Sequence, residues 1–144
     1  MHEIRTEIDI EASPARVWTV LTDFPAYPSW NPFLKSITGQ AEKGRQLVAR
    51  IEPEGGRGMT FKPTVLIAER DKEFRWRGRF LVPGLFDGEH YFMIEPSSAG
   101  STRLVHGERF SGLLVSMARS SLDKGTRGGF IAMNKALKAR AEAS

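Results

Sequence analysis

The segment from Ser111 to Ala143 most constrains the fold, because its pattern is typical of one long helix with an apolar stripe. Its apolar residues recur at steps of mostly three or four, which keeps them on one side of a helix, at Val115, Ala118, Leu122, Gly129, Met133 and Leu137. Charged residues fall largely on the opposite side. We expect the helix to run from about Leu113 to Glu142, with Ser111 as its N-cap. A helix with one apolar side that follows a run of strands needs a sheet to pack on.

Three glycines interrupt the middle of this segment, at Gly125, Gly128 and Gly129. Each costs roughly 1 kcal/mol relative to alanine inside a helix. Their presence predicts a bend, or a place where the backbone must come close to another part of the chain.

The chain before this helix predicts strands and one short helical insert. Ile4, Thr6, Ile8 and Ile10 alternate with charged residues, which indicates a half-buried strand. Ser13-Pro14 is a typical helix start, and the proline- and aromatic-rich segment 23–33 predicts a compact knuckle. About six further strands follow. No linker or repeat divides the chain, so we expect a single domain over residues 1–144.

Composition excludes several classes of protein. The chain has no cysteine, so it has no disulfide and no thiolate metal site. No stretch approaches the roughly 20 apolar residues of a membrane span, and the N-terminus lacks the apolar core of a signal peptide. The net charge of +4 is a mild excess that favours solubility. We expect a cytoplasmic protein.

Two loops rich in glycine and proline are expected at 53–58 and 83–88. The second contains Leu85 and Phe86, which look exposed, and we expect it to gate an internal site.

Several motifs resemble one family, the START-like superfamily, and within it the polyketide cyclase/dehydrase-like branch, in bacteria often called SRPBCC proteins. They are the knuckle ending in Trp30-Asn31-Pro32-Phe33, Trp76 with Gly78, the run 90–96, and the run 102–112 before the last helix. The resemblance covers nearly the whole chain. It implies an α+β helix-grip fold, with a curved antiparallel sheet of about six or seven strands around the C-terminal helix and a cavity between them.

Strand alternation predicts which side chains face this cavity. The expected lining is mostly aromatic and aliphatic, as in pockets for small organic ligands. The residues are Trp30, Phe61, Val65, Trp76, Phe80, His90, Phe92, His106, Glu108, Phe110, Phe130, Met133 and Asn134. A hydrophobic core has the same composition, so the alternative that most of them simply pack together stays open.

His90, His106 and Glu108 are the polar exceptions on this inward face. If the last hairpin folds about Ser98, His90 lies opposite His106, with Glu108 diagonal to His90. A structural hydrogen-bonded pair, a ligand-orienting or acid–base role, and a metal site are three alternatives. We expect no metal, because two neighbouring strands rarely give metal geometry without a third.

The remaining sequence features argue against other binding functions. Arg75, Arg77 and Arg79 form an outward basic stripe without interleaved aromatic residues, so we expect a face that is solvated or partly covered by the N-terminal helix, and no nucleic acid. Gly55, Gly56 and Gly58 complete no nucleotide-binding fingerprint, so we expect no cofactor. The chain also lacks the Gly-x-Ser-x-Gly motif that carries the serine nucleophile of many hydrolases.

Two function classes are the main candidates. One is a module that binds a small hydrophobic, aromatic, lipid- or polyketide-like molecule. The other is a cyclase or dehydratase that uses the cavity His and Glu as acid and base. An adaptor that binds a protein partner through the outer sheet face is a third possibility. The few convergent polar groups, His90, His106, Glu108 and Asn134, favour binding.

Overall fold

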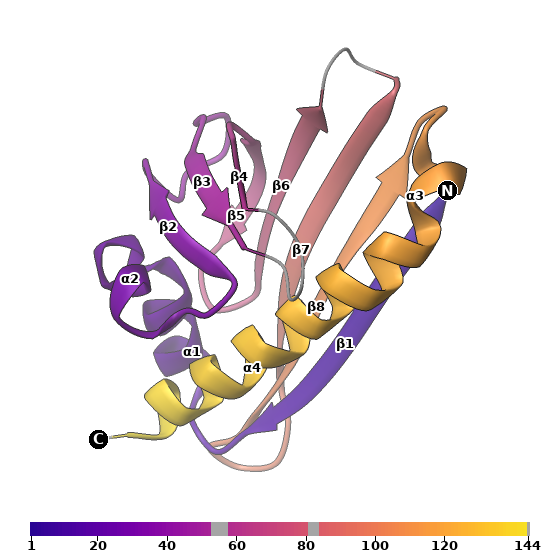
Figure 1. The fold of residues 1–144 in the computed structure, drawn as a ribbon. Helices are drawn as coiled ribbons and strands as arrows, with labels where there is room; N and C mark the ends of the chain where they lie inside the picture. The colour runs from indigo at the N-terminus through magenta and orange to yellow at the C-terminus, as the bar shows by residue number, and fades with distance from the viewer. Residues whose placement is uncertain (53–57, 81–83, 144) are drawn as a thin grey trace.

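The computed structural model describes residues 1–52, 58–80 and 84–143, apart from the side chains of Phe80, Ser121 and Leu122. A curved antiparallel sheet holds the long C-terminal helix against one face (Figure 1). The α+β helix-grip arrangement expected from the sequence is therefore confirmed. No helix within the described residues is long and apolar enough to cross a membrane.

The described residues form eight strands in two sheets. One sheet has the order β1-β8-β7-β6-β5 and the other β2-β3-β4. The strands are β1 (His2–Ile10), β2 (Leu34–Thr38), β3 (Val48–Ile51), β4 (Met59–Phe61), β5 (Thr64–Glu69), β6 (Glu73–Phe80), β7 (Phe86–Pro96) and β8 (Thr102–Ser111).

The expectation of one sheet with six or seven strands is wrong in this detail, and Pro63 gives the physical reason. Proline has no N–H for the ladder, so β4 ends before it and β5 begins after it, although the alternation of Phe61, Pro63 and Val65 is typical of one continuous strand. Backbone bonds still join the two sheets here. Leu47 N donates to Pro63 O at 2.8 Å, and Val65 N donates to Arg45 O at 2.8 Å.

A second irregularity turns Ile67 to the outer side. Val65 pairs with Trp76 and Ile67 with Arg75, so two steps along β5 match one step along β6. Simple alternation along β5 would place Ile67 on the inward face with Val65, and the bulge prevents this.

The helical insert follows β1 and closes one end of the sheet. In α1 (Pro14–Thr22), the Ser13 hydroxyl accepts a bond from Arg16 N at 3.2 Å, which confirms the expected cap. A 3-10 turn (Phe24–Ala26) and a one-turn helix, α2 (Tyr27–Trp30), form the knuckle. Asn31 Oδ1 then accepts bonds from the backbone N–H groups of Phe33 and Leu34 at 3.0 and 2.9 Å. The Asn31 side chain thus fixes the conformation of the end of the knuckle.

The C-terminal helix is continuous but changes pitch. It consists of α3 (Val115–Ser121), a wider π-helical turn (Leu122–Thr126) and α4 (Arg127–Glu142). The expectation that Ser111 caps this helix is wrong, because Ser111 is the last residue of β8. Gly125 lies in the π turn. Gly129 lies against the Phe33 ring, where an added Cβ would be 2.2 Å from Phe33 Cδ1. The glycine-rich middle therefore provides both a change of pitch and the predicted close approach.

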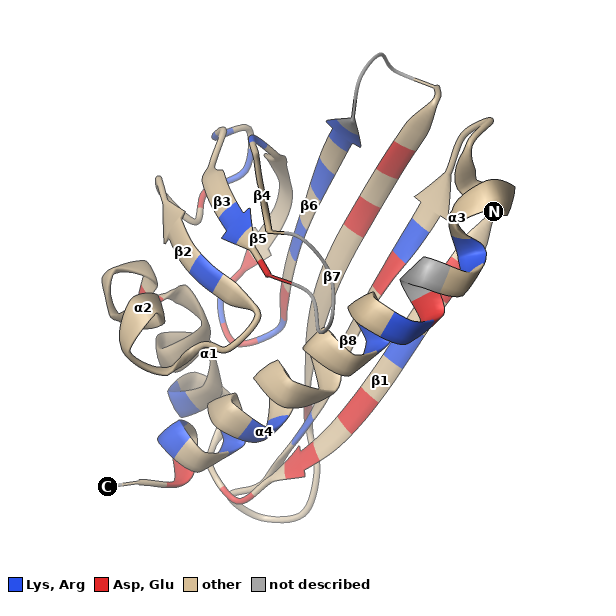
Figure 2. Ribbon diagram, in the orientation of Figure 1, with Lys and Arg blue, Asp and Glu red and all other residues tan. Residues whose placement is uncertain are grey.

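Opposite charges line neighbouring strands on the outer face of the sheet. Figure 2 shows basic bands on β6 beside acidic bands on β7. Arg75 is not a fully solvated residue, since its Nε lies 2.7 Å from Glu73 Oε2 and its Nη1 2.8 Å from Glu89 Oε1. Its guanidinium also lies 5.0 Å from the centre of the Tyr91 ring. Arg77 and Arg79 are exposed, as expected.

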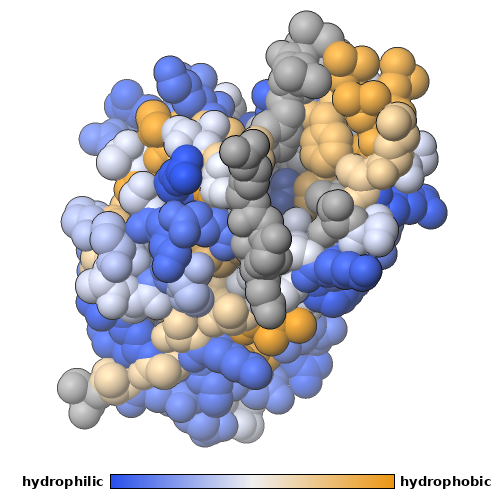
Figure 3. All heavy atoms as spheres, viewed as in Figure 1, coloured by the Kyte–Doolittle hydropathy of each residue, from blue (hydrophilic) through white to orange (hydrophobic). Residues whose placement is uncertain are grey.

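Of the two expected loops, residues 53–57 and 81–83 lie outside the described part of the chain. The rest of the second loop is shorter than expected, because Phe86 already begins β7 and is partly buried. Leu113 N and Leu114 N donate to the carbonyls of Gly84 and Leu85 at 3.1 and 3.0 Å. Hydrophobic residues gather at this end of the molecule, near α3 (Figure 3). The gate stays a prediction.

We expect Gly129→Ala to lower the free energy of unfolding by about 1–3 kcal/mol, because the new methyl group overlaps Phe33. Helix propensity alone would instead raise it by roughly 1 kcal/mol. Urea unfolding measures the difference. In the background of Phe33→Ala the same substitution should cost less, and equal costs in both backgrounds would show that Phe33 is not the cause.

Candidate functional site

The inward face of the β7–β8 hairpin carries the polar residues singled out in the sequence. The register pairs His90 with Glu108 and Phe92 with His106. The expected pairing of His90 with His106 is therefore wrong, because the turn is centred one residue later than Ser98. The inward face is unchanged, since side chains in a strand alternate with a period of two. His90, His106 and Glu108 still lie together.

Aromatic rings enclose the two histidines. The ring of His90 stacks on Trp76 at 4.6 Å between centroids, and that of His106 lies 4.4 Å from Phe92. From the other side, Phe130 of α4 stacks on His106 at 4.1 Å. Both imidazoles are therefore removed from water, at 3% and 0% exposure.

A continuous chain of hydrogen bonds runs through this aromatic surround. Glu108 Oε1 lies 3.2 Å from His90 Nδ1, and His90 Nε2 lies 2.8 Å from His106 Nε2. His106 Nδ1 lies 2.8 Å from Asn134 Oδ1 on α4. Asn134 Nδ2 donates to Thr6 Oγ1 at 2.8 Å, and Thr6 donates to the backbone carbonyl of His106 at 2.7 Å. The chain therefore ties together β7, β8, the C-terminal helix and β1.

Burial controls the protonation of this chain. It lowers the pKa of His90 to about 3 and the pKa of His106 well below its usual range, the latter also because His90 is close. Burial raises the pKa of Glu108 to about 8. Each shift favours the uncharged form, so at neutral pH the chain consists of two neutral imidazoles and a carboxylic acid.

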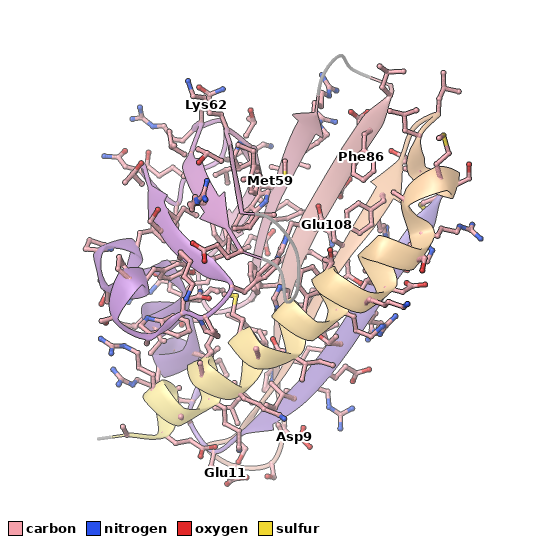
Figure 4. All side chains as sticks on the ribbon, viewed as in Figure 1. Asp9, Glu11, Met59, Lys62, Phe86 and Glu108 are labelled. Atoms are coloured by element: carbon pink, nitrogen blue, oxygen red, sulfur yellow. The ribbon has the colours of Figure 1, made fainter. Side chains whose placement is uncertain are left out.

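Glu108 is the outer end of the chain. Its side chain is 14% exposed, compared with 3% for His90. Its second oxygen, Oε2, lies over Gly88 of β7, where an added Cβ would be 2.2 Å from it. Gly88 pairs with Gly78 of β6, so two neighbouring inward positions beside the carboxyl group carry no side chain. Figure 4 labels Glu108 on the side of the sheet that faces the helix.

Most of the predicted lining lies in the protein interior. The fully buried members are Val65, Trp76, His90, Phe92, His106, Phe110, Phe130, Met133 and Asn134. Trp30 and Phe61 are partly buried and pack against the core. The side chain of Phe80 lies outside the described residues. A cavity bounded by these residues stays a prediction.

Sequence reasoning missed two members of the site. Thr6 was assigned only to an alternating strand, although it is the single polar residue among the inward isoleucines of β1. Gly88 was assigned to a loop, whereas it provides the space that the Glu108 carboxyl group occupies. The break in the apolar pattern at Thr6 was the available signal. Gly88 had none, because its role depends on the register with β8.

The arrangement of the two histidines does not suit a metal ion. Two zinc ligands, each about 2.0–2.1 Å from the ion, lie farther apart in tetrahedral geometry than the 2.8 Å between the two Nε2 atoms. Within the described residues, no group of three or more His, Asp or Glu side chains is placed to hold a metal. The two histidines are instead hydrogen-bonded to each other, to Glu108 and to Asn134.

Comparisons with known proteins agree with this fold. The family model described as "Polyketide cyclase / dehydrase and lipid transport" matches residues 1–142. No curated protein sequence gave a significant match.

Similar solved structures include the Zhui aromatase/cyclase from Streptomyces sp. R1128, with 17% identity, a TM-score of 0.79 and coverage of 98% of this chain and 93% of that chain. A START superfamily protein from Mycobacterium smegmatis has 24% identity, a TM-score of 0.70 and coverage of 99% and 98%. Norcoclaurine synthase from Thalictrum flavum has 15% identity, a TM-score of 0.75 and coverage of 97% and 93%. At these identities the likeness shows the fold alone.

The buried chain should give stability an optimum near pH 6.5. Below that pH, the unfolded chain binds more protons than the folded one, because the folded-state pKa values of His90 and His106 are lowered from 6.5. Above it, the folded chain binds more, because the pKa of Glu108 is raised from 4.5 to about 8. The stability therefore rises with pH up to about 6.5 and falls by about 1 kcal/mol between pH 6.5 and 8, where the two histidines offset part of the effect of Glu108.

Urea unfolding across this range measures the effect, with Glu108→Gln as the matched control. The amide cannot titrate, so the fall above pH 6.5 should disappear while the rise below it remains. A fall of equal size in both proteins would mean that Glu108 does not carry it.

Proposed function

The chain belongs to the polyketide cyclase/dehydrase and lipid transport family, and we propose that it binds a small hydrophobic or aromatic molecule, of lipid or polyketide type, between the sheet and the C-terminal helix. The observation that carries this proposal is the chain of hydrogen bonds from Thr6 to Glu108, set in an aromatic surround. A structural network alone needs no accessible end, but this one ends at a carboxyl group that is 14% exposed beside two glycines.

The proposed ligand lies over Gly78 and against the Glu108 carboxyl group, which itself occupies the space over Gly88. Trp76 of β6 lies two residues before Gly78, and His90 of β7 lies two residues after Gly88. Phe110 of β8 is paired with Gly88. The surfaces next to the ligand are therefore aromatic, with one polar group at Glu108. A mainly apolar site with few polar groups is typical for small organic ligands.

A cyclase or dehydratase activity is the second candidate. It is supported by the hydrogen bond between Glu108 and His90, because a carboxyl group backed by an imidazole can take a proton on one oxygen while passing one on from the other. Binding needs only the acceptor, whereas catalysis needs this transfer. The two candidates therefore differ in what a glutamine at position 108 would do.

Binding is tested with native mass spectrometry of freshly purified protein and titration with the uncharged fluorophore N-phenyl-1-naphthylamine. We expect saturable binding at one site. Gly88→Val should weaken it about tenfold or more, because the added side chain displaces the Glu108 carboxyl group from its place over Gly88. Glu95→Val is the matched control, since Glu95 is exposed on the same strand. Absence of saturable binding, or equal affinity in the Gly88→Val protein, would contradict the proposal.

Catalysis is tested by solvent deuterium exchange into 2-tetralone, an aromatic ketone with acidic C–H bonds, followed by NMR. The enzyme candidate requires the protein to accelerate exchange and Glu108→Gln to reduce that acceleration roughly 100-fold, because an amide cannot act as a base. If the wild-type protein gives no acceleration, the enzyme candidate fails for this chemistry and binding remains.

A further inference from the structure

The inner end of the hydrogen-bond chain has a direction that no proton assignment can reverse. The backbone carbonyl of His106 can only accept, so the Thr6 hydroxyl donates its one hydrogen there, over 2.7 Å. Thr6 Oγ1 must then accept in its contact with the Asn134 side chain. Its partner is therefore the amide NH₂ group, and the amide orientation follows from the carbonyl rather than from the similar shapes of oxygen and nitrogen.

Asn134 of α4 then fixes the direction of the next hydrogen bond, which it makes with His106. With its NH₂ group facing Thr6, Asn134 presents Oδ1 to His106 Nδ1 at 2.8 Å. An amide oxygen carries no hydrogen, so His106 Nδ1 must be protonated. The protonation state of one of the two ring nitrogens of His106 is thus fixed.

Protons can now be counted without deciding which atom of each pair holds them. Three hydrogen bonds join the ionisable groups and Asn134, namely Glu108–His90, His90–His106 and His106–Asn134. Each bond contains one proton, which gives three. Two neutral imidazoles and one carboxylic acid also hold three, so the cluster is uncharged, as its burial favours. Every proton of the cluster lies inside one of these bonds, and none is left for Glu108 Oε2.

We infer that Glu108 Oε2 is a hydrogen-bond acceptor which selects ligands that present a neutral hydroxyl or N–H group, such as a phenol or an enol, and rejects carboxylates. The inference rests on the proposed ligand site. It assigns the polarity of that site, which neither the fold nor the aromatic surround determines.

The surroundings of Oε2 allow such a contact. It lies over Gly88, next to Gly78, and no hydrogen bond to it occurs within the described residues. A carboxylate placed there would oppose an unprotonated oxygen and would bring a charge to a buried, uncharged cluster. A ligand hydroxyl would instead extend the chain by one more bond.

Three naphthalenes of nearly equal size test this selectivity at pH 7: 1-naphthol, 1-methoxynaphthalene and 1-naphthoate, with affinities from calorimetry. One hydrogen bond contributes about 0.5–1.5 kcal/mol, so we expect the naphthol to bind roughly 3- to 10-fold more tightly than the ether. The naphthoate should bind least. Equal affinity for naphthol and ether, or tightest binding of the naphthoate, would overturn the inference.

Two substitutions at Glu108 control for the shape of the probes. In Glu108→Leu the acceptor is gone, so naphthol and ether should bind within about twofold of each other. In Glu108→Gln the amide NH₂ group can donate to His90 Nδ1 and leave its oxygen at the Oε2 position, so the preference should persist. A preference that survives in Glu108→Leu would contradict the role of Oε2. If none of the three probes binds the wild-type protein, the proposed function fails and the selectivity with it.

Histidine tautomers test the polarity in the ligand-free protein. Long-range ¹H–¹⁵N spectra should show His106 protonated at Nδ1, and its signals are separated from those of His2 by a His2→Gln variant. A His106 ring protonated only at Nε2 would reverse the chain and overturn the inference, whatever the probes do.

Discussion

The backbone carbonyl of His106 can only accept a hydrogen bond, and the polar interior of this protein depends on that constraint. Thr6 must donate to it, Asn134 must donate to Thr6, and His106 must donate to Asn134. These residues come from β1, α4 and β8, so the constraint is met only when the helix lies in its place on the sheet. The same bonds thus stabilise the helix-grip arrangement and set the proton order of the site.

The position of the helix itself depends on a close contact at Gly129. Phe33, at the end of the knuckle, occupies the space that a Cβ at this position would need. The Phe33 ring also packs edge-on against Phe130 at 5.5 Å, and Phe130 stacks on His106. Packing between the knuckle and the helix is therefore continuous with the surround of the buried histidines. Because interiors are close-packed, a change in the contact between Gly129 and Phe33 would also change the packing of Phe130 on His106.

The sequence was sufficient for the course and end of the helix, though not for its start, and for the alternation of β1 and the inward face of the last hairpin, since each follows from a local period. It was insufficient for the strand register, the strand count and the face of single side chains, because each of these is set by one turn or one backbone atom. The turn after Pro96 is closed by a bond from Ser97 N to Ser101 O at 3.0 Å, and this sets the register one residue away from the expected centre. His90 therefore faces Glu108 instead of His106. In the same local way, the break at Pro63 changed the strand count and the bulge at Ile67 changed the face of one side chain.

The predicted cluster nevertheless came together, because a shift that preserves parity also preserves the face. What parity could not predict is the directed chain through Thr6 and Asn134, which needs three elements at once. The most direct test is neutron diffraction from a deuterated crystal at neutral pH. We expect one deuteron in each of the bonds Glu108–His90, His90–His106 and His106–Asn134, and none on Glu108 Oε2. A deuteron on Oε2, or none on His106 Nδ1, would contradict the polarity of the site.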